Sequence, residues 1–404
     1  METRKLYYEN SNLREFSAVV TGCTQTEGGY LVTLDATAFY PEGGGQACDL
    51  GMLGDARVLD VQEQGGAVVH LCDRPLEPGR TIRGKLDWQR RLDLMQQHSG
   101  EHILSGLIHA QFGYHNVGFH VGKDVMEVDF DGPLDAQELA QLEQEANEAI
   151  WMDLPVLCGI PGPQELETLS YRSKKALSWP VRIVHIPGFD RCACCGVHVT
   201  HTGQIGLIKV ISCIKFHQGV RLELVCGKRA YDYLCRVQEQ NRQISQLLSA
   251  KPLETAPAVR RLSDQLAGEK LRSAALEKQL FRSIAENYVN CADAVHFAEG
   301  LSPAAVRELA DAIVQRCSGT VAVFSADGDK HNFCLLRKDG DVKALGDALC
   351  RELAGRGGGK PGSYQGSLTA TREEILSFWA RRQGVDNYGI CSANGFNKSA
   401  SPTP

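Results

Sequence analysis

Two pairs of residues in this sequence have the types and the spacing of metal ligands. His98 and His102 stand four residues apart, which would place both imidazoles on one face of a helix, roughly 6 Å apart at Cβ. Cys194 and His198 repeat this spacing far downstream. Three imidazoles and one thiolate can form a tetrahedral zinc site. The two pairs together predict one Zn²⁺ ion that is held from two distant parts of the chain.

The sequence alone leaves open which cysteine completes this site. Cys192, Cys194 and Cys195 stand together, and the rest of the fifteen cysteines are scattered. The N-terminal residues form no apolar run, so we expect no secretory signal. Scattered cysteines in odd number, without such a signal, indicate reduced thiols, metal chemistry rather than a disulfide framework, and a cytoplasmic location.

Glu101 lies between the two histidines of the first pair. The segment His98-Ser-Gly-Glu-His102 is similar to the H-x-x-E-H pattern of inverzincin proteases, in which the glutamate is the general base. Those enzymes need a further glutamate ligand, whereas this chain offers a cysteine and a histidine. The pattern makes Glu101 a candidate catalytic residue and makes a metalloprotease an alternative function for the protein. The alternative role for Glu101 is that of a supporting carboxylate that holds a histidine in one tautomer.

The segment that carries His98 and His102 is predicted to be a helix with one buried face, ending near Phe112 and Gly113. Residues 86–228 form the predicted zinc-containing domain, an α+β arrangement in which this helix packs on an antiparallel sheet. The apolar residues that recur at helical intervals are Leu92, Met95, Ile103, Leu104, Leu107 and Ile108.

Residues 1–85 are predicted to form a small β-barrel, because short β-branched runs alternate with turns that contain glycine. Within them stands Phe39-Tyr-Pro-Glu-Gly-Gly-Gly-Gln46. Consecutive glycines let a ligand approach the main chain closely, so Gly43, Gly44 and Gly45 are candidates for binding. The alternative is a tight corner of the barrel.

The second half of the chain is predicted to hold a helical spacer and a further domain. Residues 229–289 carry apolar residues spaced by three and four, which indicates a coiled-coil-like helical hairpin and a homodimer seam. Pro252 and Pro257 interrupt this pattern. Residues 290–391 form a predicted C-terminal α/β domain, an alternative place for a dimer contact, and the polar tail 392–404 is expected to be disordered. The seam consists of Leu234, Val237, Asn241, Ile244 and Leu248.

A glycine-rich segment in the C-terminal domain is predicted to be a loop. It runs from Arg356 to Gly366 and includes Gly357, Gly358, Gly359 and Lys360. Its spacing is not that of a P-loop, so an ATP site is not supported. A backbone nest for phosphate or RNA fits this composition.

The charge of the chain is unevenly distributed. The net charge is −6, yet residues 228–282 hold eleven Lys and Arg against six Asp and Glu. A basic arm on an acidic body suits a polyanion that is contacted in one region, and a solvated helical face is the alternative. The sequence has no run of eighteen apolar residues, so we expect no membrane span and no membrane partner.

Four of these segments together resemble the alanyl-tRNA editing proteins of the AlaX type, in the long form that carries the C-terminal domain of alanyl-tRNA synthetases. They are the glycine segment that ends at Gln46, the pair His98 and His102, the segment 194–198 and the segment 357–360. The resemblance covers nearly the whole chain. The combination of both ligand pairs with the glycine segment is specific.

The resemblance implies a trans-editing hydrolase that cleaves the ester joining serine or glycine to alanine tRNA, its partner. Four protein ligands would close the zinc site, which favours positioning of the substrate over activation of water. A pocket that hydrogen-bonds the serine hydroxyl would disfavour alanine. The implied substrate-binding residues are Gly43, Gly44, Gly45, Gln46, Thr37, Asn116 and His120, and the implied tRNA-binding residues are Gly357, Gly358, Gly359 and Lys360.

The sequence departs from the family at three positions near the ligands. Cys195 replaces a glycine, Val197 replaces a threonine, and Glu101 stands where a neutral residue is common. We find no aminoacylation domain in the chain, so we do not expect alanine–tRNA ligase activity. A non-enzymatic protein that binds zinc and tRNA is a further hypothesis, and it predicts zinc-dependent folding without deacylation.

Overall fold

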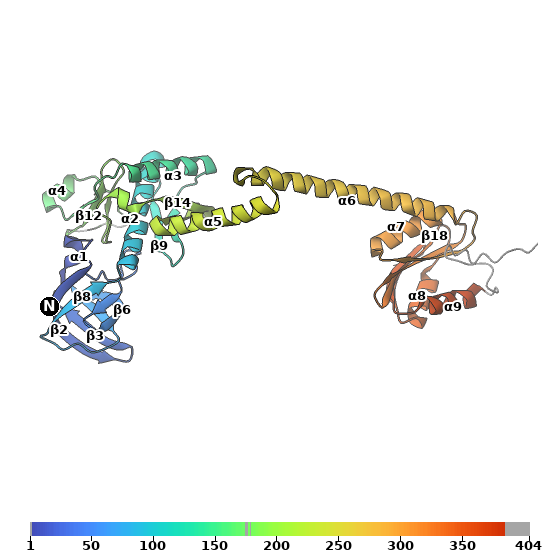
Figure 1. Ribbon diagram of the computed structural model, residues 1–404, viewed down its shortest axis with the longest axis horizontal. Helices are drawn as coiled ribbons and strands as arrows, with labels where there is room; N and C mark the ends of the chain where they lie inside the picture. The colour runs from blue at the N-terminus through green and yellow to red at the C-terminus, as the bar shows by residue number, and fades with distance from the viewer. Residues whose placement is uncertain (1, 174–176, 178, 384–404) are drawn as a thin grey trace, which may run out of the picture. The chain divides into compact units, whose positions relative to one another are not determined.

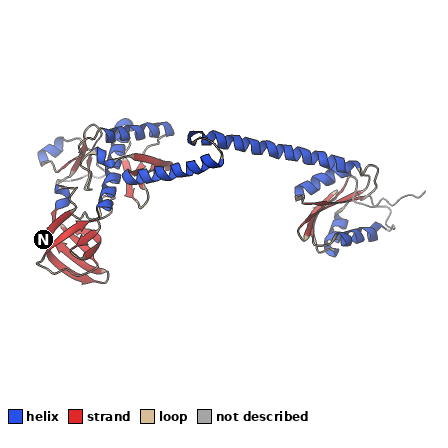
Figure 2. Cartoon of the chain, viewed as in Figure 1, coloured by secondary structure: helices blue, strands red, loops and turns tan. Residues whose placement is uncertain are grey.

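The computed structural model describes residues 2–173, 177 and 179–383. The chain forms two compact units, Met1–Leu247 and Leu248–Pro404, whose elements are labelled in Figure 1. Figure 2 shows that each unit contains both helices and strands, which agrees with the mixed α and β character expected from the sequence. The boundary falls inside the predicted spacer, and the finer division into domains stays a prediction. The predicted tail 392–404 lies outside the described residues.

The first unit begins with a closed barrel (Figure 1). Apolar residues alternate along its first strand, where Phe16, Ala18 and Val20 are buried. The ring of Phe16 covers Gly84, where a Cβ atom would lie 2.3 Å from that ring, so a side chain at 84 would displace it. In the order in which they pair, the strands are β2 (Glu15–Thr26), β3 (Gly29–Leu34), β7 (Ala67–Cys72), β6 (Ala56–Gln64), β5 (Gly51–Leu53) and β8 (Thr81–Leu86). Outside the barrel, β1 (Arg4–Lys5) pairs in parallel with β4 (Ala36–Thr37), and α1 (Leu6–Glu9) follows β1.

One long helix, α2 (Trp88–Phe112), forms the centre of the rest of this unit. The side chain of Asp87 caps its N-terminus by accepting a hydrogen bond from the backbone N–H of Arg90. Gly113 ends the helix with a φ of 72°, a conformation that glycine adopts without strain. The predicted end of the helix near Phe112 is therefore confirmed.

The buried face of α2 packs against helices and two sheets. A Cβ atom at Gly100 would lie 2.4 Å from Sγ of Cys226, and one at Gly106 would lie 2.3 Å from the carbonyl oxygen of Phe189. The two glycines therefore allow close approach on both sides. One sheet consists, in pairing order, of β14 (Ile208–Phe216), β15 (Gly219–Cys226), β10 (Met126–Phe130) and β9 (Asn116–Val121). The other sheet consists of β11 (Leu157–Gly159), β12 (Ile183–Ile186) and β13 (Asp190–Ala193). The other helices are α3 (Ala136–Trp151), α4 (Pro163–Thr168), the 3₁₀ turn η1 (Thr202–Ile205) and α5 (Gly227–Leu247).

The second unit contains one sheet with a hydrophobic cluster on each face. Along β17, Val321 and Val323 belong to one cluster, and Ala322 and Phe324 belong to the other, as strand alternation requires. In pairing order, the strands are β16 (Ala294–Glu299), β17 (Thr320–Asp327), β18 (Lys330–Arg337), β20 (Ser363–Leu368) and β19 (Arg356–Lys360), and the helices are η2 (Pro252–Glu254), α6 (Thr255–Glu286), α7 (Pro303–Val314), α8 (Lys343–Glu352) and α9 (Arg372–Gln383).

The glycine-rich segment predicted to be a loop is instead an edge strand and the start of its neighbour. Residues Arg356–Lys360 form β19, which pairs with β20. A Cβ atom at Gly357 would lie 2.6 Å from the carbonyl oxygen of Gln365, and one at Gly359 would lie 2.0 Å from that of Ser363. Glycine is needed here for a close strand contact, so the loop prediction was wrong. Gly357, Gly358, Gly359 and Lys360 are exposed, and their role in tRNA binding stays a prediction.

The predicted spacer is helical in both units. Pro252 lies in the break between α5 and α6, as expected, but Pro257 lies inside the first turn of α6, where its missing N–H is not needed. Apolar residues of the seam remain exposed, among them Val237 at 45% and Ile244 at 40%. The hairpin and the homodimer stay predictions. No helix in the described part of the chain is long and apolar enough to span a membrane.

Candidate functional site

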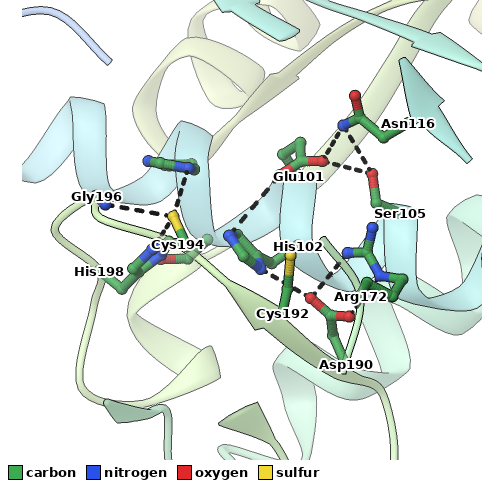
Figure 3. Close-up of polar contacts among 12 residues, drawn as sticks. Glu101, His102, Ser105, Asn116, Arg172, Asp190, Cys192, Cys194, Gly196 and His198 are labelled. Atoms are coloured by element: carbon green, nitrogen blue, oxygen red, sulfur yellow. Dashed lines mark hydrogen bonds and ion pairs between the residues drawn. The ribbon is translucent and has the colours of Figure 1, made fainter. Parts of the chain in front are cut away.

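The four predicted metal ligands meet, although they come from α2 and from the loop after β13. Figure 3 labels three of them, His102, Cys194 and His198. One ligand atom from each of His98, His102, Cys194 and His198 lies within 4.8 Å of all the others. Sγ of Cys194 is 3.4 Å from Nε2 of His98 and 3.4 Å from Nε2 of His198. Each histidine is 2% exposed. Three nitrogens and one sulfur at such separations fit a tetrahedral zinc ion. We call these four residues the metal group.

Each histidine of the metal group is oriented by a contact at its other ring nitrogen. Because Nδ1 is occupied in every case, Nε2 is the atom that each ring presents to the shared centre. This is the usual arrangement around metals that are bound by histidine. The contacts are Nδ1 of His98 with Oε1 of Gln46 at 2.8 Å, Nδ1 of His102 with Oδ2 of Asp190 at 2.8 Å, and Nδ1 of His198 with Oγ of Ser99 at 3.1 Å.

The loop after β13 directs Cys194 toward the histidines. The backbone N–H of Gly196 donates to Sγ of Cys194 at 3.3 Å. A Cβ atom at Gly196 would lie 2.2 Å from Cε1 of His98, so glycine is the residue that fits beside this ring. Cys195 is exposed and lies outside the metal group, and Cys192 belongs to a different buried group. Geometry therefore favours Cys194 among the three cysteines that the sequence left open.

The surroundings of Cys194 favour its thiolate form. Burial alone would raise the pKa of this thiol, but the adjacent histidines, His98 foremost, hold the pKa well below its usual value. Burial and the charge of His98 lower the pKa of His198 to about 3. A thiolate and a neutral imidazole are the forms in which these side chains bind metals.

Glu101 is buried on α2 beside the metal group. Its Oε1 accepts hydrogen bonds from Oγ of Ser105 and Nδ2 of Asn116, both at 2.5 Å (Figure 3). Its Oε2 lies 4.0 Å from Nε2 of His102, the atom that faces the shared centre. The carboxylate that orients His102 is Asp190 and not Glu101. Glu101 therefore does not hold the Nδ1 atom of His102, and its carboxylate lies on the side of the ring that faces the shared centre.

A cavity of about 340 Å³ opens over the metal group. Its size suits the end of a small or extended ligand. Glu101 lines it together with three of the four metal-group residues, and apolar surface comes from Phe119 and Leu177. Arg172 and Arg182 add positive charge. A buried carboxylate and a metal group in a partly apolar cavity make this the candidate active site.

One residue of the glycine segment lines this cavity. Gly43 and Gln46 exchange two backbone hydrogen bonds of 3.0 Å, which makes a tight turn. Gly44 and Gly45 have φ values of 60° and 84°, as such a turn requires. Gly44 lines the cavity, and a Cβ atom at Gly45 would lie 2.5 Å from the ring of Phe119. The segment is thus a tight turn that reaches the cavity through Gly44.

A buried ion pair joins the glycine segment to α2. Arg91 is fully buried, and its guanidinium donates to the carboxylate of Asp49 and, through Nη2, to the carbonyl oxygen of Ala38. Asp49 also accepts a hydrogen bond of 2.6 Å from the backbone N–H of Tyr40. Because Arg91 lies two turns before His98 on the same helix, it fixes this segment relative to the metal group.

Of the seven predicted substrate-binding residues, Gly44 alone is among the described residues that line the cavity. Three of the others lie outside the glycine segment. Thr37, on β4, is buried against the barrel strand β7, with Oγ1 2.9 Å from Nε2 of His70. His120 is exposed, and it follows Phe119 on β9, so its side chain projects from the opposite face of the strand. Asn116 lines a neighbouring cavity of about 220 Å³. Of the three, Asn116 comes nearest to the site through its bond to the Glu101 carboxylate.

Sequence reasoning missed several residues that shape the site. Ser99 directly follows His98, and Asp190 precedes Cys194 by four residues, so both stand near a ligand in the sequence. The histidines that they contact, His198 and His102, are however 99 and 88 residues away. Phe119 and Arg172 carry no such local signal, because they reach the cavity through the fold.

Comparison with known proteins matches two parts of the chain to protein families and finds similar solved structures. Residues 3–90 match the family described as tRNA synthetases class II (A), and residues 181–228 match the threonyl and alanyl tRNA synthetase second additional domain. The C-Ala domain from Aquifex aeolicus alanyl-tRNA synthetase is 25% identical, covers 23% of this chain and 92% of that chain, and has a TM-score of 0.21. At that TM-score the likeness supports no structural conclusion.

Relatives of known name match most of the chain. Alanine–tRNA ligase from Thermofilum pendens is 33% identical over 92% of this chain, but the match spans 43% of the ligase. The chain thus spans less than half the length of the ligases it matches. Alanyl-tRNA editing protein Aarsd1 from Danio rerio is 28% identical over 89% of this chain and 92% of that protein. Aarsd1-A from Xenopus laevis is 31% identical over 85% of this chain and 86% of that protein. The chain therefore belongs to the family of alanyl-tRNA editing proteins.

Proposed function

We propose that this protein hydrolyses the ester bond between alanine tRNA and a wrongly attached serine or glycine, at a zinc site formed by the metal group. The observation that carries the proposal is the convergence of four ligand atoms within 4.8 Å, beside Glu101, in a cavity of about 340 Å³. Relatives named alanyl-tRNA editing proteins support the choice of tRNA as substrate. Ligase activity is not expected.

The residues present fit zinc. A thiolate and three imidazoles whose Nδ1 atoms are already engaged form a tetrahedral donor set. A bound zinc ion would supply positive charge that anchors and polarises the substrate. Because the protein itself offers four ligands, the set favours anchoring of the substrate.

Glu101 is the proposed general base. One of its oxygens is held by Ser105 and Asn116, and the other lies on the side of His102 that faces the shared centre. In the proposed reaction, a water oxygen bonds to the ester carbonyl carbon and its proton passes to Glu101. Glu101 then gives the proton to the ribose oxygen as the bond between this oxygen and the carbonyl carbon breaks, so the ribose leaves with a free hydroxyl. General bases of this kind contribute about 10²–10⁴-fold to the rate.

The exposed strand β19 is the proposed tRNA contact in the second unit. It carries Arg356 and Lys360 on a glycine backbone that leaves space for a phosphate chain. A variant with Lys360→Gln should bind tRNA more weakly, and its log Kd should vary less with log salt, by a slope change of about 1. An unchanged salt dependence would argue against this contact.

The proposed function is tested with alanine tRNA that carries serine, glycine or alanine. The serine or glycine ester should disappear faster than the alanine ester when purified protein is added. Glu101→Gln should slow this loss by about 10²–10⁴-fold while the protein keeps its zinc. The matched control is Glu148→Gln, on the surface of α3, which should leave the rate unchanged.

Other outcomes would favour the alternatives. Failure to hydrolyse either misacylated ester would refute the proposal. Cleavage of a peptide library would support the metalloprotease, although the metal group is completed by Cys194 and His198 and contains no glutamate in the described part of the chain. Binding of zinc and tRNA without ester loss would support the non-enzymatic protein.

A further inference from the structure

Behind the metal group lies a buried pair of charged residues that the proposed reaction does not use. Asp190, at the start of β13, is 7% exposed. Its Oδ2 is 2.8 Å from Nδ1 of His102 (Figure 3). Arg172 donates to both oxygens of the same carboxylate, from Nε at 2.8 Å and from Nη2 at 2.9 Å. One carboxylate therefore holds a metal-group histidine and an arginine at once.

This contact determines which nitrogen of His102 can bind a metal. An ionised carboxylate only accepts hydrogen bonds, so Nδ1 of His102 carries the proton and donates it to Asp190. When the ring is neutral, its lone pair is then on Nε2, which faces the shared centre. The other two histidines of the metal group meet the neutral side chains of Gln46 and Ser99 at this position.

Two backbone hydrogen bonds also hold Arg172 in place, in addition to its ion pair with Asp190. Its N–H donates to the carbonyl oxygen of Arg191 at 2.8 Å, and its carbonyl oxygen accepts from the N–H of Ala193 at 2.9 Å. Arg172 is therefore aligned along β13 with its guanidinium against Asp190. It also lines the cavity over the metal group. Bidentate contacts of this type restrict the carboxylate to one orientation.

We propose that Asp190 and Arg172 are positioning residues that hold His102 in the tautomer and ring orientation required to bind zinc. The inference rests on the zinc site proposed above. A buried ion pair is by itself weak evidence of a contribution to stability, because desolvation offsets the attraction between the charges. The direct bond to a metal-group histidine gives this pair a role in metal retention instead.

The test measures how fast zinc leaves the protein, without any RNA. Zinc-loaded full-length protein is mixed with a chromogenic zinc chelator, and the release rate is followed by absorbance. Asp190→Asn should release zinc about 10–100-fold faster than the unaltered protein. The matched control is Asp131→Asn, which alters an exposed histidine–aspartate pair with Oδ2 3.2 Å from Nδ1 of His115. It should release zinc at the unaltered rate.

A double variant separates positioning from stability. Asp190→Asn leaves Arg172 buried without its partner, which can destabilise the fold. Adding Arg172→Gln removes that charge, so the double variant should regain thermal stability and still release zinc about 10–100-fold faster. Release at the unaltered rate from the double variant would overturn the positioning role. If the unaltered protein retained no zinc, the proposed zinc site would fail, and this inference with it.

Discussion

Two sets of buried histidines in the first unit differ in how their ring nitrogens are used. His70, in the barrel, has Nε2 2.9 Å from Oγ1 of Thr37 and Nδ1 3.1 Å from the carbonyl oxygen of Val32. In the metal group, neighbouring residues contact Nδ1, and Nε2 faces the shared centre. For example, Nδ1 of His98 contacts Gln46 and its Nε2 lies 3.4 Å from Sγ of Cys194. Both sets are buried to a similar degree. A histidine that can bind a metal is therefore recognised by a ring nitrogen that faces other possible ligand atoms, and not by the burial of its side chain.

Electrostatics separates the two sets as well. Burial lowers the pKa of His70 to about 4, so this ring is neutral at pH 7. Burial acts in the same direction on His102, but hydrogen bonds to Asp190 and Cys194 outweigh it and raise the pKa well above its usual value. The barrel histidine thus has a neutral environment, whereas the metal-group histidine lies among anions that also attract a metal ion.

The largest expected effect is the loss of zinc when the cysteine of the metal group is removed, compared with removal of the adjacent cysteine. Cys194→Ala removes the sulfur ligand, so it should abolish both zinc binding and ester hydrolysis. Cys195→Ala, at the exposed neighbouring position, should preserve both. Zinc is measured by elemental analysis and hydrolysis by loss of the serine ester. Zinc retained in the Cys194 variant would show that Cys192 or Cys195 is the ligand.

The barrel histidine should affect stability rather than zinc. Unfolded His70 takes up a proton near pH 6.5 and folded His70 near pH 4, so the unfolded chain binds more protons between these values. The free energy of unfolding should therefore fall by up to about 3 kcal/mol as the pH drops through this window. Urea unfolding at several pH values measures this.

His70→Gln is the matched variant for that experiment. Its unfolding free energy should lack this part of the pH dependence, and its zinc content should equal that of the unaltered protein. An identical pH dependence in both proteins would mean that His70 is not the neutral buried group described here.

Two glycines that lie against rings provide a smaller contrast. Gly196→Ala would place Cβ 2.2 Å from Cε1 of His98, a ring held by Gln46, and should weaken zinc binding by about tenfold or more. Gly84→Ala would place Cβ 2.3 Å from the ring of Phe16 and should cost about 1–3 kcal/mol of stability without loss of zinc. Competition with a zinc chelator and thermal unfolding measure the two effects. Equal zinc affinity in both variants would contradict the contrast.

Local patterns were sufficient to predict the helix that carries His98 and His102, and to single out Cys194 and His198 as the second ligand pair. Helical periodicity placed His98 and His102 on one helix that ends at Phe112, as observed. Asp190 and Ser99 could not be assigned in this way, because their partners His102 and His198 are 88 and 99 residues distant in sequence. Only the packing of α2 against β13 and its following loop brings such residues together.

Two errors of sequence interpretation have a common physical origin. The run from Gly357 to Gly359 suggests a loop because glycine is depleted in strands, yet β20 approaches so closely that side chains would collide. Thr37 precedes the glycine segment, but its hydroxyl contacts His70 on β7, and Thr37 does not line the cavity. In both cases a contact between distant strands overrides the local signal.

The ligand set is the central claim, and X-ray absorption at the zinc edge of the zinc-loaded protein tests it most directly. We predict three nitrogen neighbours at about 2.0 Å from imidazole rings and one sulfur at about 2.3 Å, as expected for His98, His102, His198 and Cys194. The sulfur signal should vanish in the Cys194→Ala variant and persist in Cys195→Ala. Two or more sulfur neighbours, or a shell without sulfur, would contradict this account of the site.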